Sequence, residues 1–166
     1  MPVRPSQLWK DMSPEKRLDA ATAFWNEEKE LEGLHSQHLE AIVAIAGHLK
    51  FRPKSVQALP VERRARQLAH LPAVPEAVIT RALIAHHLAA QRPLMAAFLD
   101  ALGIAHEDGL IKDENVTPPD PAKLASAAAT VAAAFPKEDV VLYLSTLVTQ
   151  DPDTWGGLES VPPLKV

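Results

Sequence analysis

Residues 76–102 read EAVITRALIAHHLAAQRPLMAAFLDAL, and this stretch decides the fold class. Before Pro93, apolar residues such as Val78, Leu83 and Leu88 recur at helical spacing and cover most faces of a helix. Proline removes one backbone hydrogen bond, so Pro93 is expected to kink this helix or divide it into two in series. A helix that is apolar nearly all round is typical of the centre of a bundle, and we expect this segment there.

Helical spacing of apolar residues continues outward from this segment on both sides, and no stretch has the alternation of a strand. Ser13-Pro14 and Asp120-Pro121 combine a preferred N-cap with a proline in the first turn. Gly103 suits the left-handed position after a helix end, with Ile104 as its apolar partner. We therefore predict an all-α fold, a compact irregular bundle of about six helices, many of them opened by proline.

Composition narrows the class of protein. A chain of 166 residues, of which 47% are hydrophobic, is expected to form a single domain, which we place over residues 13–150. An extended arm is expected at residues 1–12 and an irregular tail at 151–166. The lack of cysteine excludes disulfides, thiolate nucleophiles and cysteine-based metal sites. No secretory signal and no membrane span are apparent, so we expect a cytoplasmic protein without a membrane partner.

A first candidate site lies on the helical stretch near residues 30–50. One stripe of that helix contains Leu31, His35, His38, Ile42, Ile45 and Leu49, and the residues away from it include Glu32, Ser36, Glu40 and Gly47. Glu32 and His35 have the Glu-x-x-His spacing of di-iron carboxylate bundles. His38, and His86 from the central segment, are further candidate ligands of a divalent metal. A second Glu-x-x-His is missing, and the alternative is that these histidines are core residues bonded to backbone carbonyls.

A second candidate site follows the end of the central segment. Asp100, His106 and Asp108 place an imidazole among carboxylates in a loop, which is suitable for general acid–base chemistry. The same residues also suit a helix C-terminus followed by an Asp-Gly turn. Both interpretations remain open from the sequence.

A third group is basic and spans residues 50–66. It contains Lys50, Arg52, Lys54, Arg63, Arg64 and Arg66, opposed by Glu62. Such a cluster can meet phosphates, but no nucleic-acid-binding motif accompanies it, and the net charge of −4 argues against that partner. Trp155, in a Pro/Gly-rich tail, is either an anchor that docks the tail or an exposed partner contact.

Catalytic signatures are missing from the sequence. It contains no nucleophile elbow and no phosphate-binding loop. We therefore expect a non-catalytic module for protein interaction or assembly, including a homodimer, with Arg63, Arg64, Arg66 and Trp155 as partner-binding candidates and no cofactor. One alternative is a metal-binding helical bundle that uses Glu32, His35, His38 and His86. A further alternative is a nucleic-acid accessory protein that uses the basic cluster.

Overall fold

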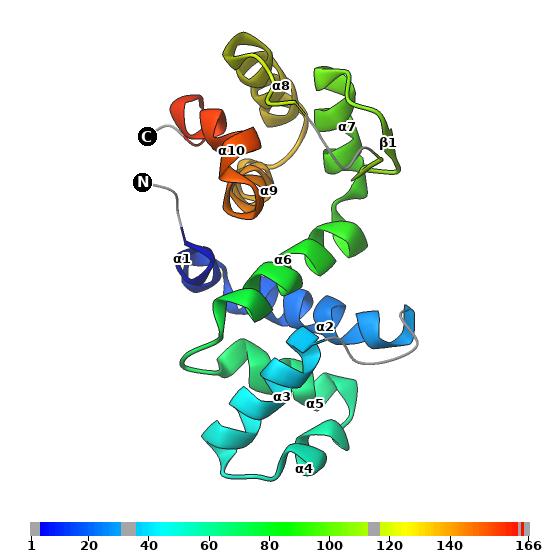
Figure 1. Cartoon of the computed structure of the whole chain (residues 1–166), viewed down its shortest axis with the longest axis vertical. Coiled ribbons are helices and arrows are strands. Elements are labelled where there is room, and N and C mark those ends of the chain that lie inside the picture. Colours follow the sequence, from blue (N-terminus) through cyan, green and yellow to red (C-terminus); the bar gives the residue numbers. More distant parts are fainter. Residues whose placement is uncertain (1–3, 31–35, 113–116, 163, 165–166) are drawn as a thin grey trace. The chain divides into compact units, whose positions relative to one another are not determined.

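The computed structural model describes residues 4–30, 36–112, 117–162 and 164, and within them the fold is all-α, as predicted (Figure 1). The described residues form ten α-helices, a short 3-10 helix and one pair of two-residue strands. The helices are α1 (Pro5–Asp11), α2 (Pro14–Glu30), α3 (Ser36–Leu49), α4 (Pro53–Gln57), α5 (Val61–His70), α6 (Glu76–Ala90), α7 (Arg92–Leu102), α8 (Pro121–Ala134), α9 (Lys137–Gln150) and α10 (Pro152–Trp155). The count exceeds the predicted six because several stretches expected to be irregular or continuous are short separate helices.

Two compact units divide the chain. The N-terminal unit covers Pro5–His86, and the C-terminal unit is built from His87–Val166. The boundary falls inside α6, so this helix contributes residues to both units. Whether residues 13–150 behave as one cooperative domain stays a prediction.

In the N-terminal unit, α2 and α5 lie side by side, and α3 contacts α4 and α5. Its largest fully buried side chains are Phe24, Trp25, Ile45, Leu68, Ile79 and Leu83. Ser13 caps α2 as predicted, because its hydroxyl oxygen accepts from the Lys16 amide at 3.2 Å. On α3, the predicted stripe contains the buried His38, Ile42 and Ile45.

In the C-terminal unit, α7 packs against α8, and α9 contacts α8 and α10. Helix α9 is the most continuously buried element, since every side chain from Leu142 to Val148 is buried. The core of this unit joins Leu94, Phe98, Leu99, Leu124, Leu144, Trp155 and Leu158 with neighbouring small and apolar residues. Burial on nearly all faces is what a helix at the centre of a unit requires.

The predicted interruption near Pro93 is confirmed. Helix α6 ends at Ala90, Gln91 leaves helical geometry, and α7 begins at Arg92 with Pro93 in its first turn. A proline is tolerated there because the first helical N–H groups have no partner within the helix. At the other end of α7, Gly103 is left-handed (φ 71°) and the Ile104 amide donates to the Leu99 carbonyl at 3.0 Å, as expected.

Both predicted flanking segments contain helix. The extended arm was wrong for residues 5–11, which form α1, because Pro5 occupies a helix start and Leu8 and Trp9 are buried. The predicted irregular tail contains α10 and the 3-10 helix Gly156–Ser160. Asp151 starts α10, since its carboxylate accepts from the Thr154 amide and hydroxyl. None of the helices in the described part of the chain is both long and apolar enough to span a bilayer.

Candidate functional site

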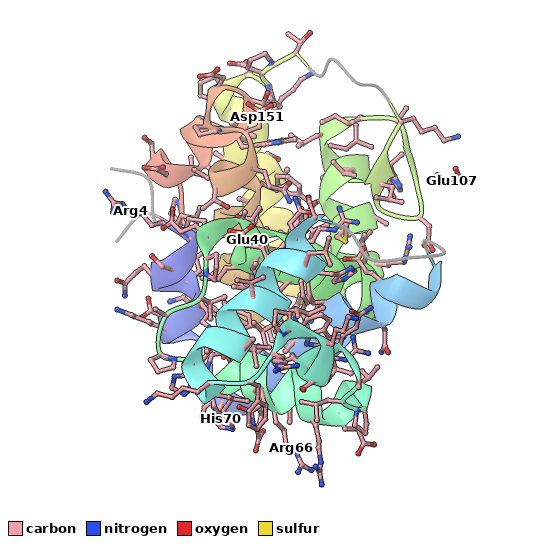
Figure 2. The ribbon with its side chains drawn as sticks, turned by 60° about the horizontal axis from the view of Figure 1, so that its bottom comes forward. Arg4, Glu40, Arg66, His70, Glu107 and Asp151 are labelled. Atoms are coloured by element: carbon pink, nitrogen blue, oxygen red, sulfur yellow. The ribbon has the colours of Figure 1, made fainter. Side chains whose placement is uncertain are left out.

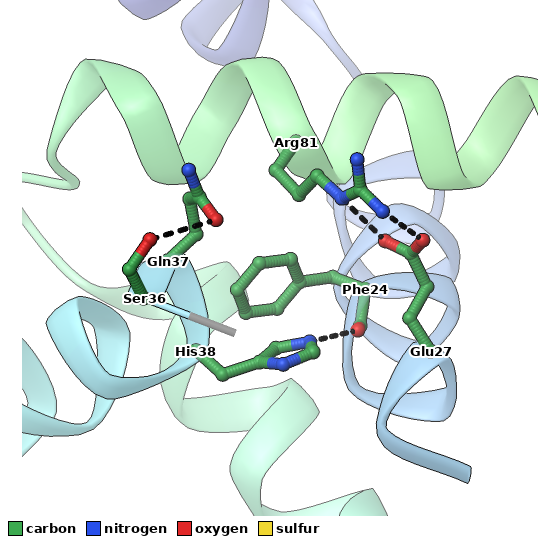
Figure 3. Close-up of polar contacts among 6 residues, drawn as sticks. All are labelled: Phe24, Glu27, Ser36, Gln37, His38 and Arg81. Atoms are coloured by element: carbon green, nitrogen blue, oxygen red, sulfur yellow. Dashed lines mark hydrogen bonds and ion pairs between the residues drawn. The ribbon is translucent and has the colours of Figure 1, made fainter. Parts of the chain in front are cut away.

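His38 is fully buried in an aromatic cluster of the N-terminal unit (Figure 3). Its Nε2 lies 2.7 Å from the carbonyl oxygen of Phe24, and because a carbonyl only accepts, this nitrogen carries the proton. The imidazole stacks on Trp25 with ring centroids 5.6 Å apart and meets Phe24 edge-on at 4.6 Å. The full burial of His38 and its bond to a main-chain carbonyl match the core interpretation, and any metal would have to bind the other ring nitrogen, Nδ1.

A second buried polar contact lies beside this cluster. The guanidinium of Arg81 on α6 donates to both carboxylate oxygens of Glu27 on α2, at 3.1 and 2.7 Å (Figure 3). Glu27 is buried and Arg81 is half-buried. A bidentate pair of this kind fixes the angle between two helices as well as their separation. The pair ties α6 to α2 within the N-terminal unit.

The structure describes only two of the four predicted metal ligands. Glu32 and His35 lie outside them, and His86 is buried on α6. No group of three or more histidine, aspartate or glutamate side chains in the described ranges could hold a metal ion. A metal site that includes Glu32 and His35 therefore stays a prediction.

The loop candidates form a structural hairpin rather than an open catalytic group. His106–Glu107 and Leu110–Ile111 pair as the antiparallel strands β1 and β2. The Gly109 amide donates to Nδ1 of His106 at 3.1 Å, so the proton is on Nε2, which donates to Asp100 at 2.7 Å. Both ring nitrogens are thus occupied, and the imidazole connects the end of α7 to the turn. The geometry supports the turn interpretation rather than a general base.

Asp108 and Gly109 make the turn of this hairpin. Both have positive φ, 51° and 91°, as a two-residue turn with Asp-Gly requires. The Arg92 guanidinium donates to the Asp108 carbonyl at 3.0 Å and to the Leu88 carbonyl at 2.9 Å. A Cβ on Gly109 would lie 2.8 Å from the Cβ of Met95, so the hairpin approaches α7 too closely for a side chain. Asp108 therefore serves the turn and does not join Asp100 and His106.

Two of the partner-binding candidates, Arg64 and Trp155, are buried, which does not favour that role for them. Arg64 is only 6% exposed and its guanidinium lies over the Trp25 ring, 4.9 Å from the centroid. Trp155 is 4% exposed and contacts Phe98 in the core of the C-terminal unit, so it docks the tail as the alternative proposed. Arg63 and Arg66 are exposed on α5 and stay candidates.

An exposed apolar face of α3 was missed by the sequence reasoning. Among the described residues, four large apolar side chains are exposed, and three of them are Leu39 (51%), Val43 (61%) and Phe51 (52%). Leu39 and Val43 are one turn apart on the side of the helix that also carries Ser36, Glu40 and Gly47. The signal was present in the sequence, because these two residues lie outside the stripe that contains His38 and Ile42. We call Leu39, Val43, Gly47 and Phe51 the α3 apolar face.

A pocket of about 390 Å³ was also missed. It lies in the N-terminal unit between α1, the start of α2 and the connector from α5 to α6. Trp9, Leu71 and Ile79 are buried side chains of its lining, and Lys10, Arg17 and His70 are its basic ones. Its residues come from two distant stretches of sequence, so no local spacing could have predicted it.

The assignment of these candidate sites rests only on the geometry of this chain. No protein family model matches the sequence, and neither a curated protein nor a solved structure is significantly similar to it.

Proposed function

We propose that the protein is a non-catalytic assembly module that self-associates through the α3 apolar face. The observation that carries this proposal is the exposure of Leu39 and Val43 on one face of α3, with Phe51 exposed two residues after the helix ends. Apolar side chains grouped on a surface are typical of sites that bind another protein. The remaining large apolar residue that is exposed among those described, Leu110, lies in the hairpin of the other unit.

The order of residues along α3 favours a second copy of the same chain as the partner. In a twofold-symmetric antiparallel pair, residues at equal distances before and after a central position meet each other. With the twofold axis midway between Val43 and Gly47 on the exposed side of α3, Val43 would meet Gly47 of the other copy, and Leu39 and Glu40 would lie near Phe51 and Lys50, which follow the helix end. The pairs are complementary in size in the middle of the helix, because Val43 of one copy lies opposite Gly47 of the other.

The middle of the face also has the space that such a pair needs. A Cβ built on Gly47 would meet nothing within 4 Å, so the surface there is open to an approaching side chain. Close approach of two helices depends on small residues at their crossing point. Val43 of one copy would fill the space above Gly47 of the other.

Charges at the two ends of the face are complementary in the same antiparallel arrangement. Glu40 is exposed near the start of α3, while Lys50, Arg52 and Lys54 are exposed directly after its end. Opposite charges across an interface fix its register and suppress other arrangements. A parallel arrangement would bring the three cations of both copies together. One helix pair buries little area, so the expected dimer is weak and concentration-dependent.

Sedimentation equilibrium over a range of protein concentrations tests the proposal. Val43→Glu is expected to shift the equilibrium to monomer, because it would bury an unpaired carboxylate in both halves of the interface. Leu110→Glu is the matched control, since it replaces another exposed apolar residue and should leave self-association unchanged. A wild-type protein that remains monomeric at all concentrations, or equal effects of the two variants, would contradict the proposal.

A charge exchange tests the antiparallel register separately. Glu40→Lys and Lys50→Glu are each expected to weaken the dimer, because each places like charges opposite one another. The double variant restores opposite charges at both symmetric positions and should recover most of the wild-type affinity. Additive weakening in the double variant would show that Glu40 and Lys50 do not meet.

A further inference from the structure

The pocket in the N-terminal unit has an apolar floor and a basic rim. Trp9, Ala69, Leu71 and Ile79 are buried and form apolar lining. Lys10 and His70 are exposed lining residues, and Arg17 is half-buried. Among the described residues, none that line the pocket carries a carboxylate. Its volume of about 390 Å³ lies within the range of small-molecule sites.

Other contacts account for part of this polar rim. Nη1 of Arg17 donates to the carbonyls of Trp9 and Lys10, at 3.4 and 3.3 Å, so this guanidinium holds the end of α1 in place. The Ser6 hydroxyl donates to the carboxylate of Glu76 at 3.1 Å, so its proton is not offered to the pocket. Glu76 lies outside the lining and is exposed to solvent. Lys10 and His70 are therefore the side chains most available to a ligand.

The positions of Lys10 and His70 at helix ends explain why basic side chains are favourable there, but they do not explain why these two residues line a cavity. Lys10 and His70 are in the last turns of α1 and α5, where carbonyl groups stabilise positive charge. That interaction needs no space between the two helices. Figure 2 shows His70 and Arg66 at the same edge of α5, yet only His70 belongs to the pocket lining.

We propose that this pocket binds a small organic anion with an apolar or aromatic body, such as an aromatic carboxylate. The body would lie on Trp9, Leu71 and Ile79, and the carboxylate would face Lys10 and His70. Apolar contact supplies most of the affinity in such a pocket, and a few charged groups select the ligand. The site is independent of the α3 apolar face, so either proposal can fail alone.

Benzoate and benzylamine are the probes, because they share a ring and carry opposite charges. In ¹H–¹⁵N spectra of the full chain, benzoate is expected to shift the amide signals of Ala69 and Ala73 saturably. Benzylamine is expected to bind at least about fivefold more weakly, and acetate, which lacks the ring, should bind more weakly than benzoate. Equal affinity for benzoate and benzylamine, or no saturable shift with benzoate, would overturn the proposal.

Variants identify the residues responsible. Lys10→Gln combined with His70→Gln should weaken benzoate binding about fivefold, since the Lys10 ammonium and the His70 imidazole, the two exposed basic groups of the rim, are removed. Arg66→Gln is the matched control, because Arg66 is an exposed cation one turn from His70 and should have no effect. A second variant, Ala73→Phe, keeps every charge and should abolish binding by filling the pocket. Benzoate affinity that is unchanged in all three variants would show that the anion binds elsewhere.

Discussion

The two units of this chain use buried polar side chains differently. In the N-terminal unit, His38 and the Glu27–Arg81 pair lie inside or beside the core and join separate helices. In the C-terminal unit, the buried Thr146 hydroxyl donates to the Leu142 carbonyl of its own helix, the polar contacts of His106 and Asp151 lie at helix ends and turns, and the core is mainly Leu and Val. The N-terminal unit also carries the α3 apolar face and the basic pocket. Polar groups in a core limit the ways in which helices can pack, which would suit the proposed self-association of the N-terminal unit.

The largest effect that separates the units is expected from removing His38. His38→Ala leaves a cavity between Phe24 and Trp25 and an unpaired Phe24 carbonyl, so it should lower the free energy of unfolding by about 3 kcal/mol. His106→Ala removes a half-buried side chain from a turn and should cost about 1 kcal/mol. Urea denaturation followed by circular dichroism measures both. Equal losses would remove the proposed distinction between the units.

A smaller effect is expected in the hairpin of the C-terminal unit. Gly109→Ala adds a Cβ that would lie 2.8 Å from the Cβ of Met95, at φ 91°, so steric overlap adds to backbone strain. We expect a loss of about 2 kcal/mol. Gly103→Ala is the matched control, because φ is also positive there but nothing lies within 4 Å of the new Cβ. It should cost only about 1 kcal/mol in the same urea denaturation experiment. A larger loss at Gly103 would contradict the close approach of the hairpin to α7.

Local sequence signals predicted some of these features and could not predict others. Three features were predictable because each depends on residues within one helical turn: the start of α2 at Ser13-Pro14, the break before Pro93 and the left-handed Gly103. The burial of Arg64 under an aromatic ring was not, because Trp25 is distant in the sequence. The pocket was not predictable for the same reason, because its lining joins two stretches that are distant in the sequence. Trp155 was ambiguous because a tail tryptophan suits a core and a partner surface equally well.

A stabilising effect is expected where α3 ends. Lys50 is left-handed with φ 59°, and the Phe51 amide donates to the Ala46 carbonyl at 2.9 Å. Glycine adopts this conformation without steric cost, so Lys50→Gly should raise the free energy of unfolding of the monomer by about 0.5–1 kcal/mol. The same change removes the proposed partner of Glu40 and should weaken self-association. Chemical denaturation at low concentration and sedimentation at high concentration report the two effects separately. A variant that gains stability but keeps full self-association would contradict the Glu40–Lys50 contact.

The smallest effect at neutral pH is expected from Tyr143→Phe, below about 1 kcal/mol, because the ring packing is preserved. Burial raises the pKa of the Tyr143 phenol above its ordinary value of about 10, since the phenolate is poorly solvated in the core. Above about pH 10, the Tyr143 phenol therefore keeps its proton in the native state but loses it in the unfolded chain. The stabilising contribution is therefore complete below about pH 10 and is lost as the pH rises above it.

Above pH 10, the free energy of unfolding of wild type should therefore fall more steeply with pH than that of Tyr143→Phe. Both proteins have the same lysines, so the lysine contribution cancels when one free energy is subtracted from the other. Tyr143 is the chain's single tyrosine, so phenolate absorbance follows this one group. Absorbance that develops near the ordinary pKa while the protein is still folded would show that water reaches the phenol. The C-terminal core would then be open to solvent at Tyr143, and its description as a closed apolar core would be wrong.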